Sequence, residues 1–118
     1  MKENMKLKNA FQLRSRLTVY VPSTMDVNVQ IDTSAYVDKT AELMSKCFGG
    51  SSSTPALGYW VSDTMGLVKE KTTLVFSNCN DSDLDEKLDL VIEWCEIMKK
   101  ELNQEAIALE LNGIMYFI

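Results

Sequence analysis

Two stretches of the chain repeat apolar residues at helical spacing, and their places in the sequence limit the possible folds. The apolar residues of the first stretch recur at steps of three and four: Val37, Ala41, Met44 and Phe48. Thr33 or Ser34 can cap the start of this helix, and Gly49 stands where a left-handed C-cap is expected. The second stretch carries a longer stripe: Leu84, Leu88, Val91, Cys95, Met98 and Leu102. We therefore expect two amphipathic helices.

The other apolar stretches alternate with polar residues, which is the pattern of β-strands with one buried face. We expect strands at residues 17–21, 55–61, 67–77, 106–111 and 114–118. Asn112-Gly113, between the last two, is a strong hairpin signal. The order βαββαβ, with an added short strand, predicts an α+β fold of the ferredoxin-like, split βαβ type. Its antiparallel sheet carries both helices on one face and ends in a C-terminal β-hairpin.

A chain of 118 residues is long enough for one domain with a real core. We assign residues 1–15 to a flexible N-terminal lead-in and residues 16–118 to a single ferredoxin-like domain. Two helices cannot cover both faces of the sheet. The uncovered face bears Tyr20 and either Tyr59 or Trp60, so we expect a lid, a ligand or a second subunit on it. We therefore predict a homo-oligomer, either a dimer or a larger assembly.

Charge and residue types exclude several classes of function. The net charge of −5 opposes binding to nucleic acid phosphates, so we expect no direct DNA binding. No apolar run reaches the ~20 residues of a membrane span, and no signal peptide is visible. The three cysteines show no CxxC spacing and histidine is absent, so we expect a cytoplasmic protein with no metal site and no cofactor. Without histidine the commonest general base is missing, and we predict no catalytic residue.

Residues 48–70 concentrate the residue types that shape a binding site, including four of the five glycines. Glu70 shares strand parity with an apolar set, so its carboxylate should meet a donor or line a cavity. Trp60 can stack on a flat ligand, and Gly58 leaves room beside its indole. The predicted ligand-binding residues are Gly49, Gly50, Ser51, Ser52, Thr54, Gly58, Trp60, Glu70 and Arg16.

Each of these residues also has a structural interpretation. Glu70 can form an ion pair with Arg16 or with a lysine across the sheet, and Trp60 can be part of ordinary sheet packing. The serine run follows a helix instead of opening one, which weakens the interpretation as a phosphate-binding loop. An acidic face on the second helix is either solvated or a surface for a basic partner, and it consists of Asp85, Asp89, Glu93 and Glu96.

Three segments carry a further pattern: FGGSSSTPALGYW, GLVKEKTTLVF and NQEAIALELNGIMYFI. The positions that define it are Phe48, Gly49, Gly58, Trp60, Gly66, Glu70, Gln104, Glu105, Ala106 and Ile107. This pattern resembles a family of small bacterial and mobile-element proteins of unknown function with a ferredoxin-like fold. The resemblance covers residues 16–118; it supports the fold and implies no particular activity.

The function we expect is the binding of a small polar or nucleotide-like ligand near Trp60, Glu70 and the glycine-serine loop, without catalysis. On a phage or another mobile element, such a protein would serve counter-defence by sequestering a signal molecule. The alternative is an acidic protein-protein inhibitor of a host enzyme. A third hypothesis is a small dimeric ferredoxin-like enzyme with Glu70 as general base.

Overall fold

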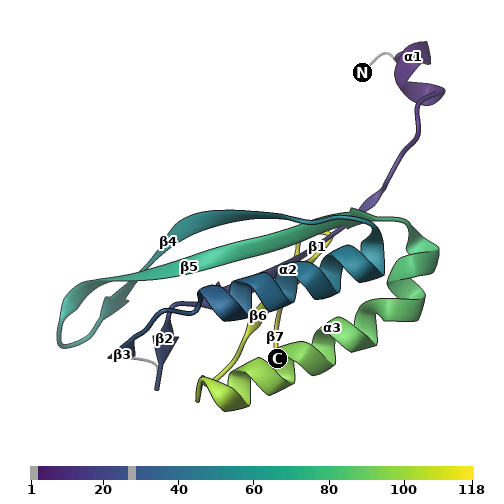
Figure 1. The fold of residues 1–118 in the computed structure, drawn as a ribbon. Coiled ribbons are helices and arrows are strands. Elements are labelled where there is room, and N and C mark those ends of the chain that lie inside the picture. The colour runs from purple at the N-terminus through teal and green to yellow at the C-terminus, as the bar shows by residue number, and fades with distance from the viewer. Residues whose placement is uncertain (1–2, 27–28) are drawn as a thin grey trace.

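The computed structural model describes residues 3–26 and 29–118. Its main sheet contains five strands in the order β4-β5-β1-β6-β7 (Figure 1). These strands are β1 (Ser15–Pro22), β4 (Ser52–Ser62), β5 (Gly66–Cys79), β6 (Ala108–Leu111) and β7 (Ile114–Phe117). All neighbouring strands are antiparallel. Together with helices α2 (Ser34–Phe48) and α3 (Asp81–Glu101), they confirm the predicted α+β, ferredoxin-like fold and its C-terminal hairpin.

Helices α2 and α3 lie on the same face of the sheet (Figure 1). The core forms between this face and the helices, where Val19 of β1 lies between Val75 of β5 and Leu109 of β6. These three side chains are at most 3% exposed, as are Met44 and Val91 from the helices. Fully burying such side chains stabilises the fold by about 1.5–3 kcal/mol each. Within residues 3–26 and 29–118, no helix covers the opposite sheet face, which we call the open face (Figure 1).

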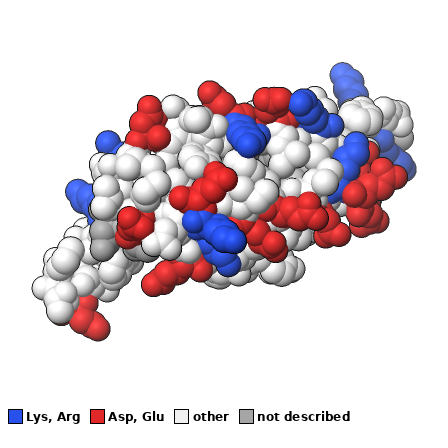
Figure 2. All heavy atoms as spheres, turned by 60° about the horizontal axis from the view of Figure 1, so that its bottom comes forward, with Lys and Arg blue, Asp and Glu red and all other residues white. Residues whose placement is uncertain are grey.

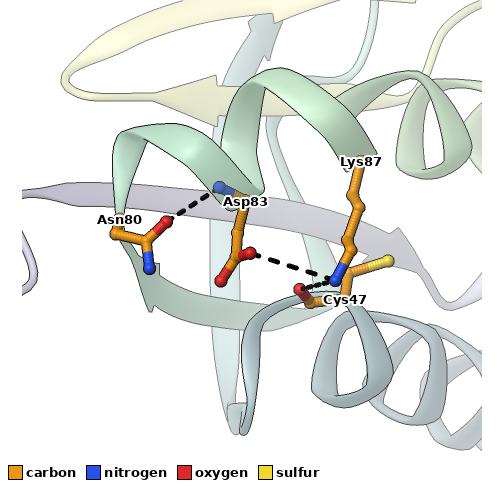
Figure 3. A network of polar contacts seen from close by, with 4 residues as sticks. All are labelled: Cys47, Asn80, Asp83 and Lys87. Carbon is orange, nitrogen blue, oxygen red and sulfur yellow. Dashed lines mark hydrogen bonds and ion pairs between the residues drawn. The ribbon is translucent and has the colours of Figure 1, made fainter.

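Polar contacts link the end of α2 to the start of α3 (Figure 3). Asn80 caps α3, because its side-chain oxygen accepts a hydrogen bond of 2.8 Å from the backbone N–H of Asp83. Lys87 Nζ donates to the carbonyl of Cys47 at 3.3 Å and lies 4.0 Å from the Asp83 carboxylate. A cation at a helix C-terminus is favourable. The predicted left-handed C-cap of α2 is confirmed at Gly49, whose φ is 88°.

Parts of two segments that were expected to be loops form β-strands. The hydroxyl run before Pro55 was expected outside the strand, but β4 begins at Ser52 because residues 52–54 pair with residues 74–76 of β5. The stretch after Pro22 contains a short hairpin of β2 (Thr24–Met25) and β3 (Val29–Gln30). In the segment expected as the lead-in, α1 (Met5–Lys8) stands away from the sheet (Figure 1).

The β4–β5 hairpin extends beyond the rest of the sheet and beyond both helices (Figure 1). Its neighbour β1 ends at Pro22, which faces Thr72, whereas the pairing of β4 with β5 continues to Ser62 and Gly66. Large apolar side chains of the projecting part are exposed: Leu57, Tyr59, Trp60, Val61, Met65 and Leu67. The end of β1 and the flank of β5 therefore form a corner at the edge of the main sheet.

Candidate functional site

A cavity of about 450 Å³ occupies the corner at the end of β1. Residues from four parts of the chain line it, among them Tyr20, Gly58, Glu70, Leu74, Gln104 and Ala106. Tyr20 pairs with Leu74, and Gly58 pairs with Glu70. Their positions alternate with those of buried core residues, so these side chains lie on the open face. A cavity of this volume is in the usual range for small-molecule sites.

Side-chain hydrogen bonds hold the corner in shape. The Ser23 hydroxyl donates to the Lys71 carbonyl at 2.6 Å, and the Thr72 hydroxyl donates to the Val21 carbonyl at 2.9 Å. These bonds tie the end of β1 to β5 where their ladder stops. On the other side, the Gln104 amide nitrogen donates to the Thr24 carbonyl at 2.9 Å. Gln104 is thereby held with its side-chain oxygen available as an acceptor.

Glu70 lines the cavity, and Trp60 contacts it from beside the cavity. The indole Nε1–H of Trp60 donates to Glu70 Oε1 at 3.2 Å, and the indole is 51% exposed. Glu70 therefore both meets a donor and lines a cavity, whereas its strand parity predicts at least one of the two. The same register puts Trp60 rather than Tyr59 on the open face with Tyr20.

Gly58 leaves the cavity open beside this pair. A Cβ atom at position 58 would come no closer than 3.7 Å to the Glu70 carbonyl, which is an ordinary van der Waals contact. Backbone crowding therefore does not require glycine here. The missing side chain instead gives a ligand access to the Glu70 carboxylate from the side of β4.

The cavity combines an apolar floor with hydrogen-bond acceptors. Leu74 and Ala106 supply apolar surface, while Glu70 and Gln104 supply acceptor oxygens. Tyr20 contributes an aromatic ring with a hydroxyl that can donate or accept. Lys71 also lines the cavity, so its two charged residues are of opposite sign, and the arrangement favours a ligand with hydrogen-bond donors on a flat apolar body.

The other predicted residues lie at the opposite end of β4. Gly49, Gly50, Ser51 and Ser52 line a separate hollow of about 330 Å³ together with Phe76. Arg16 stacks on the Phe76 ring with its guanidinium carbon 3.9 Å from the centroid. In an extended strand, the six residue steps from Ser52 to Gly58 span roughly 20 Å. The structure therefore brings Gly58, Trp60 and Glu70 together, with Thr54 between the two groups.

The polar groups of the glycine-serine loop serve the fold. The Ser51 hydroxyl donates to the Ala41 carbonyl at 3.0 Å and lies 2.8 Å from the Ser45 hydroxyl. The Gly50 carbonyl accepts from the Ser77 hydroxyl at 2.7 Å. These bonds anchor the start of β4 to α2 and β5.

A larger hollow of about 840 Å³ lies on the helix side, between the start of α2 and the β4–β5 hairpin. Its polar rim includes Asp32, whose carboxylate accepts a 2.9 Å hydrogen bond from the backbone N–H of Ser34. This bond lowers the pKa of Asp32. Thr33 occupies the N-cap position of α2, but its hydroxyl donates to the Pro22 carbonyl at 2.7 Å. Asp32 thus performs the capping that we had assigned to Thr33 or Ser34.

The acidic side chains expected on α3 are exposed: Asp85, Asp89, Glu93 and Glu96. Figure 2 shows carboxylates spread over one face of the molecule, with lysine and arginine side chains among them. In the described part of the chain, no helix is long and apolar enough to cross a membrane. Likewise, the described residues contain no group of three or more metal-ligating side chains placed to hold an ion.

The sequence analysis did not include Tyr20, Leu74, Gln104 or Ala106 among its site residues. Two of them could have been found from the sequence, because Gln104 and Ala106 are among the positions that resemble the family of small bacterial and mobile-element proteins. Tyr20 was noted only as part of the uncovered face. Their convergence on Glu70 depends on strand pairing across distant parts of the chain.

No model of a protein family matches the chain, and none of the curated proteins compared with it matches in sequence. Among the solved structures that match in fold are two of a phage SAM lyase. A phage SAM lyase in complex with S-methyl-5′-thioadenosine has a TM-score of 0.59 and 16% sequence identity, over 88% of each chain. A phage SAM lyase in the apo state has a TM-score of 0.60 and 16% identity, over 88% of this chain and 87% of that chain. This chain therefore shares its fold with a phage protein that binds a small nucleoside ligand.

Proposed function

We propose that this protein binds an adenine nucleoside with a sulfur substituent at the 5′ position, in the cavity beside Glu70. S-Adenosylmethionine (SAM) and S-methyl-5′-thioadenosine belong to this class. The proposal is carried by the Glu70 carboxylate, which stands on the wall of an apolar-floored cavity and accepts a hydrogen bond from Trp60. The shared fold with a phage SAM lyase bound to such a nucleoside supports the choice of ligand class.

The chemistry of the cavity suits this class. Adenosine offers amino and hydroxyl donors, and SAM adds a positively charged sulfonium, whereas Glu70 and Gln104 offer acceptor oxygens. The ring of Tyr20 in the cavity, and that of Trp60 beside it against Glu70, offer flat surfaces for the base. Stacking of a base on an aromatic side chain contributes about 1–3 kcal/mol.

In a phage or another mobile element, such binding would serve counter-defence. SAM is the methyl donor of many enzymes, and a protein that sequesters SAM or a related nucleoside signal withholds it from the host. This role needs no catalytic group, which agrees with a chain that contains no histidine.

Titration calorimetry with SAM, S-methyl-5′-thioadenosine and methionine tests the proposal. We expect the two nucleosides to bind and methionine, which lacks the adenosine group, to give no signal. The absence of heat with both nucleosides would overturn the proposed ligand class. Native mass spectrometry of protein purified from cells adds a second readout, because a retained nucleoside supports this function and a co-purified host protein supports the acidic-inhibitor alternative.

A second candidate function is cleavage of the same ligand, favoured by the presence of a carboxylate in the cavity and by the fold shared with SAM lyases. S-Methyl-5′-thioadenosine forms when the C–S bond to the aminocarboxypropyl group of SAM breaks with its electron pair left on sulfur, while a nucleophile, either water or that group's own carboxylate, bonds to the released carbon. Chromatography of SAM incubated with the protein separates the two functions. Formation of the thioether over many turnovers shows catalysis, and stoichiometric retention of intact SAM shows binding alone.

A further inference from the structure

Strand β7 is an edge strand without the usual protection against pairing with another strand. It lies at the end of the sheet order, beyond β6. Its residues are exposed by 57% at Ile114, 38% at Met115, 47% at Tyr116 and 74% at Phe117. Natural edge strands commonly carry a charge, a proline or a bulge that discourages pairing. The sequence IMYF contains no charge and no proline.

The hydrogen-bond pattern of the C-terminal hairpin shows which backbone groups point to the open edge. Ile107 and Ile118 exchange both of their backbone hydrogen bonds, at 3.0 and 2.9 Å. Hydrogen-bonded and non-hydrogen-bonded pairs alternate along an antiparallel ladder, so Tyr116 also bonds to β6. The N–H and C=O groups of Met115 and Phe117 therefore point away from β6, to the outside of the sheet.

We propose that β7 binds β7 of a second copy of this chain, antiparallel and around a two-fold axis at Tyr116. In this register Met115 of each copy faces Phe117 of the other copy. The two pairs exchange four backbone hydrogen bonds, which use every outward group of both residues. A strand whose outward groups complement those of an identical strand fits a symmetric partner, because one patch then serves both subunits.

The side chains of β7 agree with this partner. Met115 and Phe117 share the open face with Glu110 of β6, whose position is paired with Met115. Each methionine would lie opposite a phenylalanine, a favourable contact between sulfur and an aromatic ring. Tyr116 lies on the helix side beside an apolar cavity of about 270 Å³ whose lining includes Leu88 and Ile92. The other edge strand, β4, contains Pro55 and a serine run and is the less suitable edge.

Disulfide trapping tests the register. The two Tyr116 residues form the non-hydrogen-bonded pair at the axis, with Cα atoms about 4.5 Å apart, so Tyr116→Cys should give covalent dimers under mild oxidation. The Met115→Cys control has a similar exposure. Its two copies would be separated by about 8 Å along the ladder, too far for a disulfide. The native cysteines are buried, so they should not react.

A second pair of variants keeps the test valid if Tyr116→Cys does not fold. A mixture of Met115→Cys and Phe117→Cys chains should cross-link to each other, and neither variant should cross-link alone. In addition, Met115→Pro removes an outward N–H without breaking a bond to β6, so it should convert a dimer into a folded monomer in light scattering. A monomeric parent protein, or an oligomer in which neither cysteine combination cross-links, overturns the proposal.

Discussion

Replacing Glu70 with glutamine separates a structural role of this carboxylate from a binding role. The substitution keeps the shape of the side chain and removes its charge. Its hydrogen bond partner, Trp60, is 51% exposed, so water competes for both groups. An exposed charged contact contributes less than about 1 kcal/mol to stability. Thermal melts of Glu70→Gln should therefore stay close to those of the parent protein.

Binding should respond far more strongly than stability. A hydrogen bond to a charged group is worth about 1.5–3 kcal/mol, which corresponds to a roughly ten- to hundredfold loss of affinity for SAM or S-methyl-5′-thioadenosine. Glu110→Gln is the matched control, because Glu110 lies on the same face but does not line the cavity. Unchanged affinity in Glu70→Gln, or an equal loss in the Glu110 control, would refute the assignment of Glu70 to the site. A large drop in melting temperature would instead show a structural role.

Three further outcomes follow from the structure. Gly58→Leu should abolish nucleoside binding in calorimetry without lowering the melting temperature, since position 58 has room for a Cβ atom and its side chain would fill the cavity. Thr40→Val should cost about 1–3 kcal/mol in denaturant unfolding, because the buried Trp94 Nε1–H loses its 2.7 Å acceptor. Burial raises the pKa of the Cys95 thiol to about 12, above its unfolded value. The free energy of unfolding should therefore be unaffected by this thiol below about pH 9. Between about pH 9 and pH 12 the thiol should lower it by at most about 1.4 kcal/mol per pH unit, and Cys95→Ala should reduce this slope.

Local patterns predicted the helices and the last hairpin, because the signals for these elements lie within them. The apolar stripe from Leu84 to Leu102 placed α3 correctly. Asn112 and Gly113 have φ angles of 51° and 85°, as a two-residue turn with two left-handed positions requires. The predicted start of β4, at residue 55 instead of Ser52, was wrong because a serine run resembles a loop when it is considered alone. Its pairing with β5 makes it a strand, and that pairing is a contact between distant segments.

The candidate site was predicted in part for the same reason. Alternation along β5 identified Glu70 as a polar residue on an apolar face, and the structure puts it beside Trp60 and Gly58. Gln104 lies between α3 and β6, and it reaches the same corner through contacts with a distant segment, such as its hydrogen bond to the Thr24 carbonyl. Sequence proximity also grouped Ser52 with Gly58, although an extended strand separates them by roughly 20 Å.

The β4–β5 hairpin continues beyond the end of β1, so the candidate site on it lies outside the core. No residue of 49–74, a range that the structure describes completely, belongs to the buried core. Gly58 and Glu70 are instead held by the ladder between β4 and β5, whose backbone bonds do not depend on those side chains. Substitutions at the cavity wall can therefore change the bound ligand while the core around Val19 keeps its packing. A loss of binding in this hairpin with an unchanged melting temperature is thus evidence about the site itself.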